Sequence, residues 1–182
     1  MSDCIRLHNL IEHSFVNGPD SRFVIWMQGC PLHCSGCFNP DTHDVTGGFD
    51  MPVTELVDRI NNAPDIRGIT LTGGEPLMQT KAIGKLLALL DRKLDVLLFS
   101  GFTFDEVMAS DEKKKVVYQT DASLLGRYDR SKPHPFYGKK LVLNGEKIKK
   151  EELKPWFNTE VLIQETNVSI TGLYKKVGRS EK

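Results

Sequence analysis

The sequence predicts an α/β fold built around a mostly parallel sheet, and three observations favour it. Apolar segments that suit buried strands alternate with segments of helical periodicity from residue 21 to about residue 110. Glycines follow two of these strands, at Gly73 and Gly101. At 182 residues, with no internal repeat or visible interdomain linker, the chain is long enough to bury one core. We therefore expect a single domain over residues 1–182, made of βαβ units.

The elements of the first part can be placed one by one. A continuous apolar run from Phe23 to Met27 predicts a buried strand. Val53, Leu56 and Ile60 recur at helical spacing and predict an amphipathic helix. In chain order we expect a strand over 21–28, a helix over 52–61, a strand over 68–72, a helix over 79–92, a strand over 94–100 and a helix with a capping box from Thr103 to Glu106.

The pattern weakens after about residue 111, where the apolar runs become shorter. Short strands are expected over 122–128, 139–143 and 159–164, with a further one over 168–171. The segment 131–137 contains Pro133 and Pro135 and predicts a loop.

Composition and charge argue against several classes of function. Basic and acidic residues number 24 each, so the formal net charge is zero and a surface for nucleic acid is not expected. No apolar run approaches the ~20 residues of a membrane span, and the first residues lack a secretory signal. We therefore expect a cytoplasmic protein, in which clustered cysteines are metal ligands rather than disulfides. Cys4 stands apart from the other cysteines, and its role is not indicated.

Three cysteines, spaced Cys30-x3-Cys34-x2-Cys37, follow the first expected strand. Close spacing allows one loop, at 30–37, to turn all three thiolates toward a metal centre. Zinc is one alternative, with His33 or His43 as a fourth ligand. A 4Fe-4S cluster is the alternative that the triplet favours. Such a cluster has four irons, so three ligands leave one iron open to a small molecule.

A second motif, Gly73-Gly74-Glu75-Pro76, follows the strand expected over 68–72. Ligands of parallel α/β sheets bind at the carboxyl ends of strands, and glycines there allow the backbone to approach a ligand closely. Glu75 either fixes the loop or accepts a hydrogen bond from an ammonium group. A Gly-Gly-Glu-Pro alone is a common turn. After a strand and a cysteine triplet, it predicts a holder for the molecule at the open iron.

The two motifs together resemble those of the radical S-adenosylmethionine superfamily. The resemblance implies an oxidoreductase that cleaves S-adenosylmethionine reductively to methionine and a 5′-deoxyadenosyl radical, with no side chain acting as acid or base. It implies a shortened partial TIM-like (βα) barrel with the cluster at the C-terminal edge of the sheet. Phe38 and Ser100 also have a purely structural alternative. The implied cluster ligands are Cys30, Cys34 and Cys37, and the implied S-adenosylmethionine-binding residues are Phe38, Gly73, Gly74, Glu75 and Ser100.

A finer resemblance, to the anaerobic ribonucleotide reductase activating proteins, covers most of the chain. These are short glycyl-radical activases, so the implied partner is a glycyl-radical enzyme that loses a hydrogen atom from a glycine. A flavodoxin or ferredoxin is the implied electron donor. Asp20 stands where this group has glycine, His43 where tryptophan is common, and 139–145 where a Gly-Ser-Ser-Asn-Gln-like segment is expected. The resemblance rests on segments 17–22, 28–30, 39–44, 100–103, 124–128 and 168–172.

Two other functions stay open. The departure at 139–145 is compatible with a different substrate. Small members of the superfamily also act on small molecules, as 7-carboxy-7-deazaguanine synthase does, and others modify peptides. A non-catalytic zinc-binding module is the remaining hypothesis.

Overall fold

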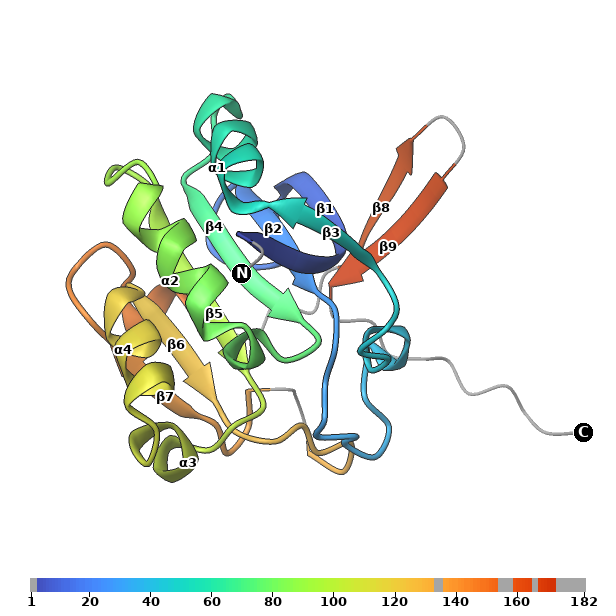
Figure 1. The fold of residues 1–182 in the computed structure, drawn as a ribbon. Helices are drawn as coiled ribbons and strands as arrows, with labels where there is room; N and C mark the ends of the chain where they lie inside the picture. The colour runs from blue at the N-terminus through green and yellow to red at the C-terminus, as the bar shows by residue number, and fades with distance from the viewer. Residues whose placement is uncertain (1–2, 133–135, 154–158, 165–166, 173–182) are drawn as a thin grey trace, which may run out of the picture.

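The computed structural model describes residues 3–132, 136–153, 159–164 and 167–172, and Figure 1 shows the fold. Its larger sheet has seven strands in the order β3-β1-β2-β4-β5-β6-β7. Neighbours from β2 to β6 pair in parallel, whereas β1, β3 and β7 pair antiparallel with their neighbours. The predicted α/β fold with parallel strands at its centre is confirmed. The strands are β1 (Cys4–Ser14), β2 (Arg22–Met27), β3 (Phe49–Pro52), β4 (Gly68–Gly73), β5 (Asp95–Ser100), β6 (Ala122–Leu125) and β7 (Lys140–Leu143).

The helices lie on one face of this sheet (Figure 1). Val53, Leu56 and Ile60 are wholly buried, as the helical spacing predicts, and they join one core with Phe23 and Ile69 of the sheet. The capping box predicted at the start of the third helix is present. The helices are α1 (Val53–Asn62), α2 (Thr80–Leu89), α3 (Phe104–Met108) and α4 (Asp111–Gln119), and the 3-10 turns are η1 (Pro40–Thr42), η2 (Pro76–Met78) and η3 (Lys150–Glu152).

Alternation along the parallel strands separates a core face from a second face. Ile25 of β2 and Leu71 of β4 enter the core beneath the helices. The next residues along these strands, Trp26 and Thr72, are paired neighbours that line a cavity on the opposite face. Phe99 of β5 lines the same cavity. The helices therefore cover one side of the sheet, and the cavity opens on the other.

Several elements differ from the sequence-based expectation. β1 and β3 were not predicted, and neither was α4. The strand expected over 122–128 ends at Leu125, because Gly126 takes a positive φ of 137° and turns the chain. The expected strands over 159–164 and 168–171 form a separate antiparallel pair, β8 (Thr159–Gln164) and β9 (Asn167–Gly172).

A network of charges occupies the amino-terminal ends of the parallel strands. Arg22 is fully buried, and its Nη2 donates to Asp95 Oδ1 at 2.5 Å. Arg67 Nε donates to the other oxygen of Asp95 at 2.9 Å, and Arg67 Nη1 donates to Glu152 Oε1 at 2.6 Å. Arg22 begins β2, whereas Cys30 follows its end. These charges therefore lie far from the cysteine loop and stabilise the opposite edge of the sheet.

Candidate functional site

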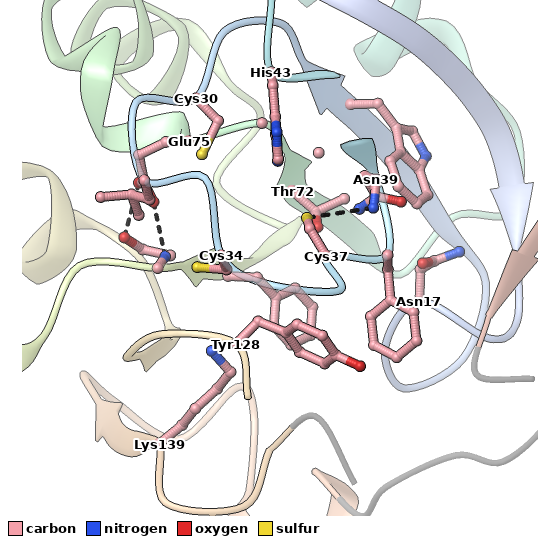
Figure 2. Close-up of a pocket in the computed structure, with 18 of the residues that line it drawn as sticks. Asn17, Cys30, Cys34, Cys37, Asn39, His43, Thr72, Glu75, Tyr128 and Lys139 are labelled. Atoms are coloured by element: carbon pink, nitrogen blue, oxygen red, sulfur yellow. Dashed lines mark hydrogen bonds between the residues drawn. The ribbon is translucent and has the colours of Figure 1, made fainter. Parts of the chain in front are cut away.

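A cavity of about 190 Å³ lies at the carboxyl ends of the parallel strands. The cysteine loop follows β2, the Gly-Gly-Glu motif ends β4, Ser100 ends β5, and Tyr128 comes after β6; each contributes to the lining. Because parallel strands end at the same edge, segments distant in sequence meet there. The structure thus brings the three cysteines and the five expected cofactor-binding residues to a single cavity. Figure 2 shows this cavity.

The cysteine loop is held in place by backbone hydrogen bonds. Cys30 N donates to His43 O at 3.1 Å, and Cys37 N donates to Cys34 O at 3.1 Å. The side-chain amide of Gln28 binds the segment that follows the loop, with Nε2 donating to Asp44 O at 2.6 Å. All three thiols line the cavity, and Cys30 is the most buried of them, at 8% exposure.

The donor set suits an iron–sulfur cluster. Burial raises the pKa of the Cys30 and Cys37 thiols, so a positive metal centre is needed to favour their thiolates. Within the described ranges, no three His, Cys, Asp or Glu side chains gather closely enough to hold a single ion. The cysteines of a 4Fe-4S cluster bind different irons and need not converge on one point. Cys4 lies on β1 and does not line this cavity.

Glu75 ties the ends of β4 and β5 together. It is completely buried. Its Oε1 accepts from Leu77 N at 2.9 Å and from Ser100 Oγ at 2.8 Å, and its Oε2 accepts from Gly101 N at 2.7 Å. Burial raises the pKa of Glu75, while the donors act in the opposite direction. The carboxylate therefore fixes the loop, which was one of its two expected roles. Its contact with a cofactor stays a prediction.

The glycine pair permits a close approach between β4 and the chain that leads into the cysteine loop. Gly73 has a positive φ of 95°, and a Cβ there would lie 2.6 Å from Met27 N. A Cβ at Gly74 would lie 2.5 Å from Gly29 O. Glu75 N donates to the same Gly29 carbonyl at 2.9 Å. Both glycines are thus required by packing, and their approach to a ligand remains an expectation.

Phe38 and Tyr128 form part of the cavity wall. Their rings are tilted at 46°, with centroids 4.6 Å apart, and Phe38 is 41% exposed. This placement suits a flat group resting on the cavity wall. By contrast, Asn144 of the segment 139–145 is absent from the cavity lining. Its Nδ2 donates to Val117 O and Thr120 O at 2.7 and 3.0 Å.

Sequence reasoning missed the place of Trp26 and Lys139 in the cavity, and it considered His43 as a fourth ligand of zinc. Trp26, expected in the core, and His43 each carry a buried ring nitrogen, Nε1 and Nε2 respectively, that has no hydrogen-bond partner among the described residues. Both residues line the cavity. Lys139 enters from the loop before β7, and its Nζ donates to Gly126 O. Burial lowers the pKa of Lys139, and the charges of Cys34 and Glu75 act in the opposite direction.

The two ring nitrogens of Trp26 and His43 show whether the cavity fits a bound group. A buried polar atom without a partner costs about 1–3 kcal/mol. Trp26 and His43 place two such atoms in the wall of one cavity that also holds three thiols. A polar ligand beside a cluster would satisfy them, so the residues fit a 4Fe-4S cluster with S-adenosylmethionine. No helix in the described part of the chain has the length and apolar character needed to cross a membrane.

Comparison with known proteins agrees with this donor set. Residues 16–145 match the family model described as a 4Fe-4S single cluster domain. The anaerobic ribonucleoside-triphosphate reductase-activating protein of Enterobacteria phage T4 is 32% identical over 127 residues, which cover 65% of this chain and 78% of that protein. The pyruvate formate-lyase-activating enzyme of Clostridium pasteurianum is 35% identical over 89 residues, covering 46% of this chain. The one from Staphylococcus aureus (strain USA300) is 36% identical over 88 residues, covering 45%.

The chain spans only 37% and 35% of the lengths of these two pyruvate formate-lyase-activating enzymes. The match to the phage protein is more extensive, covering 78% of that protein. The chain belongs to the 4Fe-4S single cluster family of radical S-adenosylmethionine activating enzymes.

Proposed function

We propose that this protein cleaves S-adenosylmethionine at a 4Fe-4S cluster and removes a hydrogen atom from a glycine of a partner glycyl-radical enzyme. The observation that carries the proposal is the meeting of Cys30, Cys34 and Cys37 with the Gly73–Gly74 strand end in one cavity. The phage relative is named as an activating protein of anaerobic ribonucleoside-triphosphate reductase. An enzyme of that type is the first candidate for the partner.

Different residues of the cavity would hold the two bound groups, the cluster and S-adenosylmethionine. Cys30, Cys34 and Cys37 would hold the cluster, and the strand end at Gly73 and Gly74 would face S-adenosylmethionine. When bound, the cluster supplies one electron to S-adenosylmethionine, which yields methionine and a 5′-deoxyadenosyl radical.

Other side chains of this cavity would orient the cofactor and exclude water. Ser100 would be held through its hydrogen bond to Glu75, which keeps the end of β5 against the end of β4. Phe38 would cover one side of the cofactor together with Tyr128. Trp26 and His43 would offer their unpartnered ring nitrogens. None of these side chains needs to transfer a proton, because the cofactor carries the chemistry.

The sheet is proposed to be a shortened form of the partial (βα) barrel. Support comes from the helices of the described chain, which lie on one face of the sheet (Figure 1), and from the cavity at the carboxyl ends of β2, β4 and β5. A shortened barrel leaves one side open, which suits a macromolecule that presents a loop to the radical. Electrons would come from a flavodoxin or ferredoxin. A cytoplasmic location is also proposed, because free cysteines of this spacing require a reducing compartment.

The proposal is tested by anaerobic reconstitution with iron and sulfide, followed by reduction and addition of S-adenosylmethionine. We expect 5′-deoxyadenosine to form, and a glycyl radical to appear in the electron paramagnetic resonance (EPR) spectrum of a co-incubated anaerobic ribonucleotide reductase. A protein that cleaves the cofactor but never generates a partner radical would have another substrate, such as a small molecule or peptide. A well-formed cluster without any cleavage would refute the proposed chemistry.

Two matched cysteine variants test the cluster ligands. Cys34→Ala removes a thiol from the cavity, so the variant is expected to lose most of its iron and all cofactor cleavage. Cys4→Ala removes a thiol that lies on β1 outside the cavity and should retain both. Iron and sulfide content per chain provides the measurement. Equal iron content in the two variants would contradict the assignment of Cys34.

A further inference from the structure

Among the described residues that line the cavity, one side chain carries a fixed positive charge. Lys139 is the one lysine or arginine in that lining, and Glu75 is the one carboxylate. The other ionisable groups of the lining are the three thiols of the cysteine loop, Tyr128 and His43. A cluster bound to these thiolates would therefore have one nearby ammonium group on the cavity wall.

The ammonium of Lys139 has no carboxylate partner at ion-pair distance among the described residues. Both oxygens of Glu75 are already used by Leu77, Ser100 and Gly101. Lys139 Nζ donates to the carbonyl of Gly126, which anchors the side chain without neutralising it. At longer range, negative charge at Cys34 and Glu75 favours the protonated form of Lys139, whereas the charge of Arg127 opposes it. In Figure 2 the side chain extends toward Cys34.

A partly buried ammonium without an anion is unfavourable, and a negative group in the same cavity offsets that penalty. Three thiolates outweigh the double positive charge of an oxidised 4Fe-4S core, so the bound cluster is an anion. One-electron reduction increases its negative charge. A fixed positive charge nearby stabilises the reduced form more than the oxidised form, and net charge is one determinant of cluster potential.

We propose that Lys139 raises the reduction potential of the cluster by placing an unpaired ammonium on its Cys34 side. The proposal rests on the cluster assignment made above. Lys139 acts through the cluster and touches no reacting atom, so it is a tuning residue. It belongs to the segment 139–145, where the sequence departs from the Gly-Ser-Ser-Asn-Gln-like pattern.

The test compares the midpoint potentials of reconstituted wild-type protein and three variants. Reduction with dithionite and redox mediators, without S-adenosylmethionine, is followed by the EPR signal of the reduced cluster. Lys139→Gln keeps a donor for the Gly126 carbonyl and removes the charge, whereas Lys139→Arg keeps the charge. Lys140→Gln is the matched control. Lys140 is exposed, is absent from the cavity lining, and lies with Nζ 5.7 Å from the Phe104 ring centroid.

We expect Lys139→Gln to make reduction at least about tenfold less favourable, a shift of about 59 mV to more negative potential. Lys139→Arg and Lys140→Gln should keep the wild-type potential. An unshifted Lys139→Gln would overturn the proposal, as would an equal shift in Lys140→Gln, because a general surface effect would then explain both.

Calorimetric titration with S-adenosylmethionine distinguishes a second use of the same charge. If Lys139→Gln binds the cofactor tenfold more weakly at an unchanged potential, the ammonium serves the cofactor carboxylate and the proposal is overturned. A wild-type protein that takes up no cluster would overturn the proposed function and this inference together. An unshifted potential in a cluster-loaded variant overturns this inference alone.

Discussion

Removal of the Glu75 carboxylate should destabilise the protein even without any cofactor. In Glu75→Ala, the donors Leu77 N, Ser100 Oγ and Gly101 N lose their acceptor, and the first two of these hydrogen bonds are buried. A buried donor without a partner costs about 1–3 kcal/mol. Two such donors predict a loss of about 2–6 kcal/mol in the free energy of unfolding, which is a large part of the ~5–15 kcal/mol typical of a folded domain.

A series of variants distinguishes the effect of losing the hydrogen bonds from the effect of losing the negative charge. Glu75→Gln keeps the carbonyl that can accept from Leu77 and Ser100, and it places an amide donor opposite Gly101 N, so its loss should be smaller than that of Glu75→Ala. Glu112→Ala removes an exposed carboxylate from α4 and should change stability by less than about 0.5 kcal/mol.

The assay for this series is urea denaturation of cluster-free protein under reducing conditions. Denaturation midpoints and slopes give the free energy of unfolding for each variant. Equal stability of Glu75→Ala and Glu112→Ala would refute the reasoning, since it would mean that the three donors find other acceptors when the carboxylate is removed. If Glu75→Ala is too unstable to purify, the Gln variant still measures the effect.

Two further predictions concern the glycine pair and acid stability. Gly74→Ala would place a methyl group 2.5 Å from Gly29 O and should reduce iron uptake. Gly84→Ala has open space around its Cβ on α2, so it should keep the iron uptake and raise the free energy of unfolding by about 0.5–1 kcal/mol. Equal iron uptake in the two variants would contradict this reasoning. Hydrogen bonds from Arg67 lower the pKa of Glu152 to about 2, so its stabilisation is present above about pH 4.5 and is lost as pH falls toward 2. Denaturation at pH 6 and pH 3 should show a weaker pH dependence in Glu152→Gln than in wild type.

The central strands were predictable because most of their residues are buried. β2 and β5 contain continuous apolar runs, at 23–27 and 96–99, whereas β4 alternates Ile69 and Leu71 with threonines and is bounded by glycines. β1 (Cys4–Ser14) was missed because polar residues interrupt it and its pairing with β2 shifts register between Leu7 and Asn9. Such an irregular alternation has no clear period of two.

The site was predictable as far as it follows the ends of those strands. The cysteine loop, Gly73–Glu75 and Ser100 each come directly after a strand, so a parallel sheet brings them together. Lys139 was not predictable in this way, because it reaches the cavity through an antiparallel return from β6 to β7. Trp26 carried a usable signal: it precedes Met27 at the end of β2 and must point away from the core if Met27 points into it.

The buried pair of Arg22 and Asp95 has a consequence for how such a protein can change over generations. It secures the amino ends of strands whose carboxyl ends carry the chemistry, and a six-residue strand such as β2 separates the two ends by about 20 Å. Substitutions that far apart generally have additive effects on stability. Selection can therefore alter the loops around the cavity while the opposite edge preserves the folded state, so new substrates become accessible without a new scaffold.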